Sequence, residues 1–362
     1  MIFLKKLFRK FSSKSKSGKA RNKAVLEKTN LNPVVAPIPA HEWESWQTFN
    51  PAAVYLDDRV HLLYRALGED GQSSLGYASS IDGINFDIRL DYPIFKLNHT
   101  PEQLEKYEDA PRNSSGGGWG GCEDPRTTFI DNRVYLSFVA FQGWDNCRIA
   151  ISSISREDFL NKNWNWKKPK TISQPGVIDK SPAIFPEKIR GKYVIMHRVF
   201  PDILVDYVDS LDFKEGEYLK GEYKISPTKK GWDSRKVGAG APPIKTDKGW
   251  LLIYYATDDA DASKYNAGAM LLDLEHPEKV IARTKEPMLE PNDWYENQGH
   301  KAGIVYPCGA IVKDGELFIY YGAADTVVAV AKAPLDDVVN AVLDSKKPNF
   351  VKKLINGLRS KI

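Results

Sequence analysis

The feature that most constrains the fold of this chain is a short strand-like pattern that recurs five times. Each copy has a polar or Gly residue followed by four to six apolar or aromatic residues, and the copies begin near Val60, Val134, Tyr193, Trp250 and Leu317. A second run follows each copy: LGYASS, RIAISS, ILVDYV, AGAMLLDL and TVVAVA. The runs are rich in Val, Ile, Tyr and Phe, and Pro and Gly fill the gaps, which favours strands over helices.

The spacing of the copies predicts the architecture. Successive copies are 74, 59, 57 and 67 residues apart, which suits one four-stranded blade with long loops per copy. We therefore predict an all-β fold, a five-bladed β-propeller in which the recurring run is the inner strand of each blade. A pair of β-sandwiches is the competing fold, but it would not predict five similar units.

In a propeller the blade loops and inner strands converge on a central funnel. The residue after the inner-strand aromatic, or after His197 in the third copy, is in turn Arg65, Val139, Arg198, Tyr255 and Gly322. We expect the two arginines and the tyrosine to point toward one axis, where the functional site would lie.

The charge distribution divides the chain into a body and two basic ends. Residues 1–28 carry ten Lys/Arg and one acidic residue, and residues 345–362 carry six Lys/Arg and no acidic residue, so 29–344 has 35 basic and 46 acidic residues. We predict a basic tail over 1–28, the propeller over 29–344, and a basic tail over 345–362 with a short helix from Val351 to Ile362. An acidic body excludes nucleic acid as a partner, because phosphate neutralisation dominates such binding.

The N-terminal end has a basic amphipathic pattern that could lie on an anionic membrane surface. Its apolar residues recur at helical spacing between lysines and arginines: Phe3, Leu4, Leu7, Phe8 and Phe11. A solvated tail is the alternative, and the Ser/Lys/Gly composition from Ser12 to Lys23 is typical of a linker. The segment lacks the unbroken apolar core of a signal peptide. No stretch reaches the roughly 18 to 20 apolar residues of a spanning helix.

Several kinds of chemistry are disfavoured by the residues present. The three cysteines, Cys122, Cys147 and Cys308, are odd in number and far apart, which argues against a disulfide scaffold and favours reduced thiols in the cytoplasm. No two histidines have zinc-ligand spacing, and no GxSxG elbow occurs. We expect no metal and no organic cofactor. Carboxylate chemistry flanked by basic residues remains, and it suits glycosyl transfer.

The densest candidate segment is GGGWGGCEDPRTTF, from Gly116 to Phe129. Repeated Gly lets a backbone approach a ligand closely, but the run lacks the Lys-Ser/Thr of a P-loop. Glu123, Asp124 and Arg126 crowd around Pro125. The segment is therefore either a catalytic loop or an Asp-Pro turn with a local ion pair.

Three further segments could contribute to a site. In WESWQTFNPAAV the residues Trp43, Trp46 and Phe49 could stack on sugar rings or belong to the core. In DSRKVGAGAPP, Lys236 could hold an anion or be a solvated surface residue. The segment YPCGAIVKDGELFIYYGAADT, from Tyr306, offers a carboxylate at Asp325.

Together these segments resemble glycoside hydrolase family 130, the β-mannoside phosphorylases and related mannosidases. The resemblance runs from about Asn32 to Ala333. It rests on FNPAAV at Phe49, LLYRA at Leu62, GCEDPR at Gly121, HR at His197, KVGAG at Lys236, AGAMLLDL at Ala267, and YPCGA with YYGAADT near Tyr306. The family fold is a five-bladed propeller, in agreement with the five copies found above.

The resemblance also implies roles for individual residues. It makes Asp124 the general acid, which delivers a proton to the glycosidic oxygen through a mannose hydroxyl. Asn50, Arg65 and Asp325 would hold the mannosyl unit, with Arg126 in the same substrate-binding set as the residue that orients the site. Inorganic phosphate, the co-substrate, would bind at Arg198 and Lys236. It would attack the anomeric carbon with inversion and give α-mannose 1-phosphate.

One residue departs from the phosphorylase pattern. Tyr255 stands where those enzymes carry His, within IYYA. Tyr can donate one hydrogen bond but adds no positive charge, which weakens the expected phosphate site. Lys180, in DKSPAIFP, is a further cation that could contribute to it.

We therefore expect an inverting phosphorylase that acts on a β-mannosidic disaccharide or oligosaccharide. The first alternative is an inverting β-mannosidase, which needs a second carboxylate roughly 6.5 to 9.5 Å from the acid. Candidates for that base are Glu290, Glu296 and Asp258. The second alternative is a non-catalytic carbohydrate-binding propeller. The resemblance leaves linkage and acceptor open, and it implies a homo-oligomer as a possible assembly.

Overall fold

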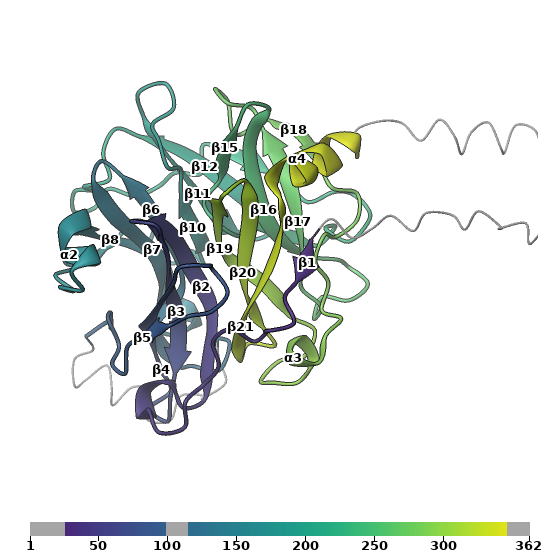
Figure 1. Cartoon of the computed structure of the whole chain (residues 1–362). Coiled ribbons are helices and arrows are strands. Elements are labelled where there is room, and N and C mark those ends of the chain that lie inside the picture. The colour runs from purple at the N-terminus through teal and green to yellow at the C-terminus, as the bar shows by residue number, and fades with distance from the viewer. Residues whose placement is uncertain (1–25, 99–114, 346–362) are drawn as a thin grey trace, which may run out of the picture.

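The computed structural model describes residues 26–98 and 115–345 of the chain (Figure 1). Strands dominate these residues, and the predicted all-β class is confirmed. The helices within them are short: η1 (Glu42–Glu44), η2 (Trp144–Asn146), α2 (Arg156–Leu160), α3 (Trp294–Asn297) and α4 (Leu335–Asp344). None of these helices is long and apolar enough to cross a membrane. The amphipathic pattern near the N-terminus and the helix predicted from Val351 to Ile362 lie outside the described residues.

The strands follow the chain in antiparallel groups, of which the first two are joined. The first group contains β2 (Gln47–Leu56), β3 (Arg59–Leu67), β4 (Gln72–Ser80) and β5 (Ile88–Arg89). The second contains β6 (Gly120–Ile130), β7 (Arg133–Phe141), β8 (Cys147–Ser155) and β9 (Lys170–Thr171). A parallel pairing of only two residue pairs, between β4 and β6, connects these groups into one eight-stranded sheet.

Three separate sheets complete the described fold. The third group contains β10 (Lys180–Ile184), β11 (Tyr193–Val199), β12 (Asp202–Val208) and β13 (Tyr223–Ile225). The fourth contains β14 (Lys236–Ala239), β15 (Ile244–Thr246), β16 (Gly249–Thr257), β17 (Asn266–Leu272) and β18 (Val280–Arg283). The fifth contains β19 (Val305–Lys313), β20 (Glu316–Ala323), β21 (Val327–Pro334) and β1 (Glu27–Lys28).

Two-residue turns explain why the same hairpin recurs. Asp57-Asp58 connects β2 to β3, Asp131-Asn132 connects β6 to β7, and Asp314-Gly315 connects β19 to β20. Both residues of each turn have positive φ. This is the type I′ geometry, which Asp, Asn and Gly tolerate and whose twist matches that of the flanking strands. The turn chemistry thus fixes the register of these strand pairs.

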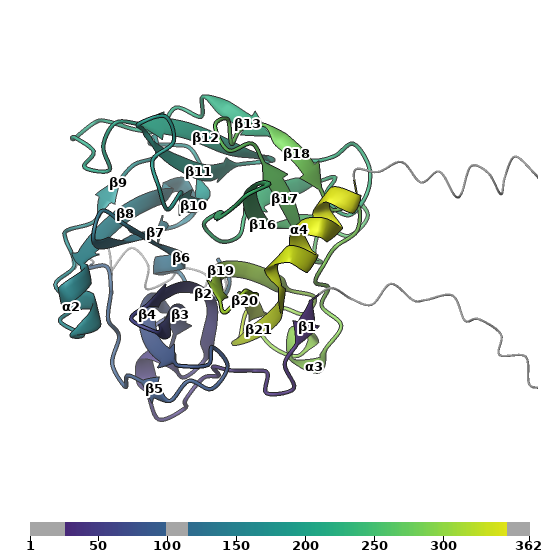
Figure 2. The same ribbon diagram turned by 45° about the horizontal axis from the view of Figure 1, so that its top comes forward.

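Apolar side chains form one cluster at each contact between neighbouring groups, and the fifth group also shares a cluster with the first. Representative pairs, in chain order, are Leu63 with Phe138, Phe141 with Ile195, Met196 with Trp250, Leu251 with Tyr321, and Tyr320 with Leu62. The groups therefore surround a common centre, as Figure 2 shows.

The recurring runs are not the strands nearest that centre. There, β2 packs against β6 and β19, and β10 packs against β6 (Figure 2). The recurring runs form the next strands outward, β3, β7, β11, β16 and β20, so the prediction that they are inner strands was wrong. The central strands are interrupted by Pro and by polar residues, as in FNPAAV and CEDPRT, which makes their apolar pattern less regular.

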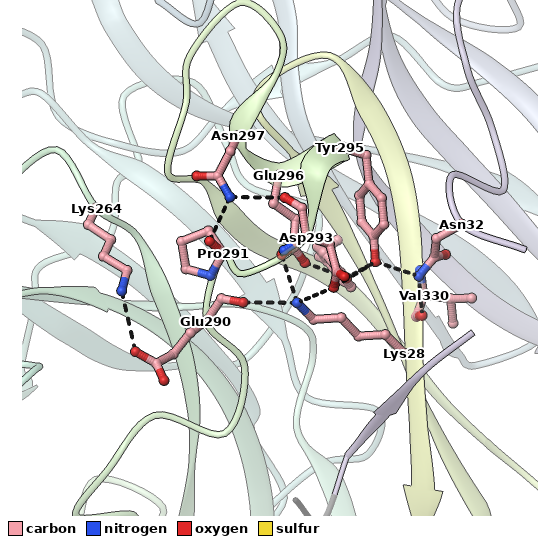
Figure 3. Close-up of polar contacts among 11 residues, drawn as sticks. Lys28, Asn32, Lys264, Glu290, Pro291, Asp293, Tyr295, Glu296, Asn297 and Val330 are labelled. Atoms are coloured by element: carbon pink, nitrogen blue, oxygen red, sulfur yellow. Dashed lines mark hydrogen bonds and ion pairs between the residues drawn. The ribbon is translucent and has the colours of Figure 1, made fainter. Parts of the chain in front are cut away.

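A short strand also precedes residue 29, where we predicted the propeller to start. Glu27 and Lys28, which we placed in the basic tail, form β1 and pair with β21. The Lys28 Nζ atom lies 2.7 Å from a Glu296 carboxylate oxygen and 2.9 Å from an Asp293 carboxylate oxygen, as Figure 3 shows. These contacts hold the N-terminal strand against the segment around α3.

Candidate active site

Strained backbone positions mark the site. Asn50, Asp124 and Ser181 each precede a proline in a central strand and have φ values of 45°, 48° and 56°. The strand register shifts at all three positions. Asp325, in the turn after β20, has a φ of 49°. Asn and Asp tolerate positive φ, so the strain is greatest at Ser181; such strained positions cost about 1–3 kcal/mol each and cluster at functional sites.

These positions surround a pocket of about 190 Å³. Eight of the nine predicted site residues line it: Asn50, Arg65, Asp124, Lys180, Arg198, Lys236, Tyr255 and Asp325. The two arginines and the tyrosine expected near one axis, Arg65, Arg198 and Tyr255, therefore do line the pocket, although they come from the second strands of their groups. Val139 packs instead into the cluster between the second and third groups. Gly322 leaves room for Asn50, because a Cβ there would lie 1.9 Å from its Oδ1 atom.

Arg126 is the predicted site residue that does not line the pocket. It is fully buried, and its guanidinium donates to the backbone carbonyls of Asp124, Ala239 and Gly240 at 2.7, 3.1 and 2.9 Å. The assignment of Arg126 to the substrate-binding set was wrong, since these backbone acceptors occupy its guanidinium beneath the pocket. Its contact with the Asp124 carbonyl does agree with an orienting role.

Asp124 is buried in a network of donors. Asn50 Nδ2 donates to Asp124 Oδ1 at 2.7 Å, and Arg65 Nη1 lies 3.4 Å from the same oxygen. Burial alone would raise the pKa of Asp124, but the charges of Arg65 and Lys180 outweigh burial and lower it below its usual value. The Asp124 carboxylate is therefore ionised in the free protein.

A second buried carboxylate, Glu123, organises two of the cations. It accepts from Arg65 Nη2 at 3.0 Å and from Ser115 Oγ at 2.8 Å, and Lys180 Nζ lies 3.3 Å away. We named Glu123 beside Asp124 in the sequence but assigned it no role. Its position next to Asp124 in GCEDPR was the signal that could have identified it.

Three pocket cations form no ion pair with any described carboxylate: Arg198, Lys236 and Lys301. The Arg198 Nε atom is buried without a hydrogen-bond partner. Lys236 donates to the Tyr265 hydroxyl. Burial, together with the charges of Arg198 and Lys301, lowers the pKa of Lys236 to about 7. Sequence reasoning missed Lys301, which lies in a loop before β19 and outside every motif considered.

Asp325 is the second carboxyl group that lines the pocket. Burial raises the pKa of Asp325 to about 6, against the opposing charges of Lys301 and Arg65. The two pocket carboxyls therefore differ, and Asp325 is the one that takes up a proton first as the pH falls.

The aromatic side chains of the pocket are mostly not the ones expected. Trp43 stacks on Tyr64 and donates to a backbone carbonyl, and neither Trp43 nor Trp46 lines the pocket, so for these two the core or surface alternative applies. Phe49 does line it, with the Arg65 guanidinium 4.6 Å above its ring. Sequence reasoning missed Trp144, which is 49% exposed at the pocket.

Three tyrosines cover another side of the pocket. Tyr255, Tyr265 and Tyr306 have ring centroids 4.4 to 5.9 Å apart. The Tyr255 hydroxyl lies 2.6 Å from Ser181 Oγ. Tyr255 thus has a polar partner within the pocket and stands beside Arg198, which agrees with its predicted place there.

The carboxylates proposed as the base of a hydrolase do not line this pocket. Glu296 is fully buried and bonds Lys28 and the Tyr321 hydroxyl. Glu290 pairs with Lys264, as Figure 3 shows, and Asp258 accepts from the backbone of Asp261. None of these three candidates for the base therefore lies at the pocket, because each is used in a local structural contact.

The site therefore combines two pocket carboxyls, polar donor side chains, aromatic rings of which Trp144 is exposed, and cations without carboxylate partners. Within residues 26–98 and 115–345, no cluster of His, Cys, Asp and Glu could hold a metal ion. Such a pocket suits a ligand that is polar and carries negative charge. The chain belongs to glycoside hydrolase family 130, whose model, described as beta-1,4-mannooligosaccharide phosphorylase, matches residues 21–344.

Similar proteins carry related names. A 1,2-beta-oligomannan phosphorylase from Thermoanaerobacter sp. (strain X514) is 39% identical, over 86% of this chain and 98% of that protein. A beta-1,2-mannobiose phosphorylase from the same organism is 37% identical, over 84% and 96%. A solved structure has a TM-score of 0.70 and 26% identity, over 86% of this chain and 94% of that chain. Its description reads that the GH130 family of mannoside phosphorylases contains glycoside hydrolases that target beta-1,2 mannosidic linkages in Candida mannan.

Proposed function

We propose that this chain is an inverting phosphorylase that cleaves β-1,2-linked mannosides with inorganic phosphate and releases α-mannose 1-phosphate. The observation that carries the proposal is the set of pocket cations without carboxylate partners beside Asp124. The proposed β-1,2 linkage is supported by the names of the relatives at 39% and 37% identity. A β-1,4-mannooligosaccharide phosphorylase from Ruminococcus albus is 32% identical.

Phosphate would bind at Arg198 and Lys236, with Lys180 and the Tyr255 hydroxyl as further donors. A dianion needs several fixed donors, and hydrogen bonds with charged partners are the strong ones. The pocket holds five cationic side chains, whereas three carboxylates lie at or beneath it. The excess positive charge compensates for the charge that His would have supplied in place of Tyr255. No organic cofactor takes part.

The mannosyl unit would be held by Asn50, Arg65 and Asp325. A phosphate oxygen attacks the anomeric carbon on the face opposite the acceptor sugar. The bond from that carbon to the glycosidic oxygen breaks, and this oxygen receives a proton that originates at Asp124 and passes through a mannose hydroxyl. The reaction is balanced, with a shortened acceptor and α-mannose 1-phosphate as products.

The ionised state of Asp124 in the free protein fits this role once phosphate binds. Cations that include Lys180 lower the pKa of Asp124. A phosphate dianion beside Lys180 and Arg198 would offset these charges and raise the pKa of Asp124. The acid would therefore become protonated in the complex that needs it.

We also propose that the five strand groups close into a five-bladed β-propeller. The cluster that joins the fifth group to the first and the pairing of β1 with β21 support a closed ring. A cytoplasmic location is proposed from the three buried, unpaired cysteines. A homo-oligomer and a contact of the N-terminal tail with membranes stay predictions.

Product analysis tests the function. The full chain is incubated with β-1,2- and β-1,4-mannobiose and the corresponding trisaccharides, with and without inorganic phosphate. We expect mannose 1-phosphate only with phosphate, and faster release from the β-1,2 substrates. Free mannose at equal rates in both conditions would establish the β-mannosidase. Sugar binding without turnover, unchanged in Asp124→Asn, would establish the carbohydrate-binding propeller.

A further inference from the structure

A second charged cluster lies behind the pocket, and no step above uses it. His197 Nδ1 is 2.7 Å from Asp179 Oδ2, and His197 Nε2 is 2.9 Å from Asp206 Oδ2. All three side chains are buried. Ionised carboxylates only accept hydrogen bonds, so both ring nitrogens must donate and the ring is an imidazolium. We refer to Asp179, His197 and Asp206 as the clamp.

The clamp adjoins two cations that line the pocket. Lys180 and Arg198 are cross-strand partners on β10 and β11, and Asp179 and His197 immediately precede them. Successive residues of a strand point to opposite faces. One face of this strand pair therefore carries two like charges, and the other carries a pair of opposite charges.

The like-charged pair makes this junction weak. Like charges directly opposite each other destabilise strand pairing. The ladder is also interrupted after Lys180, and regular pairing resumes only at Ala183. The ladder between Lys180 and Ala183 is therefore sparse, and the opposite-charge contact of Asp179 with His197 adds a restraint at this junction, beside the contacts of Lys180 Nζ with Glu123 and Ser115.

We propose that His197, as an imidazolium, is a positioning residue that sets the separation of Lys180 and Arg198 and thereby the affinity for phosphate. The inference rests on the proposed function, which assigns both cations to phosphate. Asp206 connects the clamp to the neighbouring loop, because its carboxylate accepts from the backbone N–H groups of residues 220–222 at 2.9 to 3.3 Å. A change in the clamp is transmitted to the pocket through β10 and β11.

The protonation state of the clamp depends on its neighbours. Burial alone would lower the pKa of His197, but its hydrogen bonds to Asp179 and Asp206 raise it to about 9. The charged groups at or next to the strands packed around the ring are Asp179, Lys180, Lys192, Arg198, Asp202, Asp206, Asp209, Glu222, Lys224, Arg235 and Lys236. Only Asp179 and Asp206 contact it. Above pH 9 the neutral ring can donate to one carboxylate only, so one of the two contacts of the clamp is lost and the restraint weakens.

The test compares phosphate binding by His197→Gln and Asp179→Asn with the wild-type protein. Calorimetry with inorganic phosphate gives Kd from pH 7 to 10, and initial rates give kcat and KM for phosphate. The control is His61→Gln, since His61 is equally buried but contacts Tyr77 and the Leu56 carbonyl, away from the pocket. Selective ¹⁵N labelling of histidine reports the charge of His197 in the wild-type protein.

We expect His197→Gln to raise the KM for phosphate about ten- to hundredfold, the size expected for a misplacement near 1 Å, with a much smaller change in kcat at saturating phosphate. In the wild-type protein we expect the affinity for phosphate to fall near pH 9, and Asp179→Asn should move this fall to lower pH. The control should behave as the wild-type protein. A neutral His197 at pH 8 in the ¹⁵N spectrum would overturn the inference even if His197→Gln failed to fold. So would unchanged phosphate binding in both clamp variants. A wild-type protein that releases no mannose 1-phosphate would instead refute the proposed function.

Discussion

The ionisation of Lys236 gives the sharpest test of the phosphate site. Its pKa of about 7, well below the ordinary 10.5, follows from burial and from the charges of Arg198 and Lys301. If phosphate binds only when Lys236 is charged, affinity follows the charged fraction. That fraction is about one half at pH 7 and about 1% at pH 9, so the Kd for phosphate should rise about 50-fold over this range.

Lys236→Arg isolates this effect, because a guanidinium stays charged throughout. The ionisation of phosphate and of His197 affects both proteins alike. The ratio of the wild-type Kd to the Lys236→Arg Kd should therefore rise about 50-fold from pH 7 to pH 9. Isothermal titration with inorganic phosphate in a phosphate-free buffer measures it, with the surface variant Lys248→Arg as the control. A ratio that stays flat from pH 7 to pH 9 would refute the reasoning.

Further predictions concern stability and the sugar side of the pocket. Lys236→Met should abolish phosphorolysis yet raise Tm by about 2–4 °C at pH 7, because a poorly accommodated charge is removed; thermal unfolding without phosphate checks this. Arg126→Lys leaves buried carbonyls without donors, at about 1–3 kcal/mol each, and should lower the free energy of unfolding measured in urea. Asp325 has a pKa of about 6, so kcat/KM of the wild-type protein should rise as the pH increases through 6. Asp325→Asn should be much less active and should not show this rise. Gly322→Ala places a Cβ 1.9 Å from Asn50 Oδ1 and 2.7 Å from the Asn50 backbone nitrogen, so it should displace this strand, raise the KM for the mannoside and lower Tm, which initial rates and thermal unfolding measure.

Much of the fold could be predicted from the sequence, because the second strand of each group has the most regular apolar pattern. Runs such as LLYRA and LLIYYA are long and apolar, so five units could be counted from them. The central strands escaped detection, since four of them, β2, β6, β10 and β19, have a proline where the strand register shifts, and β14 is only four residues long. The repeated Asn-Pro, Asp-Pro and Ser-Pro steps were visible, but their common geometry depends on backbone dihedrals that composition does not reveal.

In the candidate site, residues within sequence motifs could be predicted and residues in loops could not. Asn50, Asp124 and Lys236 lie in compact motifs, and motif resemblance located them. Lys301 and Trp144 lie in loops with no motif, and only the packing of the groups brings them to the pocket. Arg126 was assigned to the substrate-binding residues because it lies close to Asp124 in the sequence. In the fold its side chain lies below the pocket and contacts backbone carbonyls.

The pairing of β1 with β21 has a consequence for how the enzyme is made. Residues 27–28 leave the ribosome long before their partners, residues 331–332. The earliest strand must therefore wait, through the synthesis of more than 300 residues, for the hairpin that receives it. Contacts between such distant segments form late. Since the pocket takes side chains from every strand group, a chain synthesised only as far as the fourth group lacks part of the site and cannot be active.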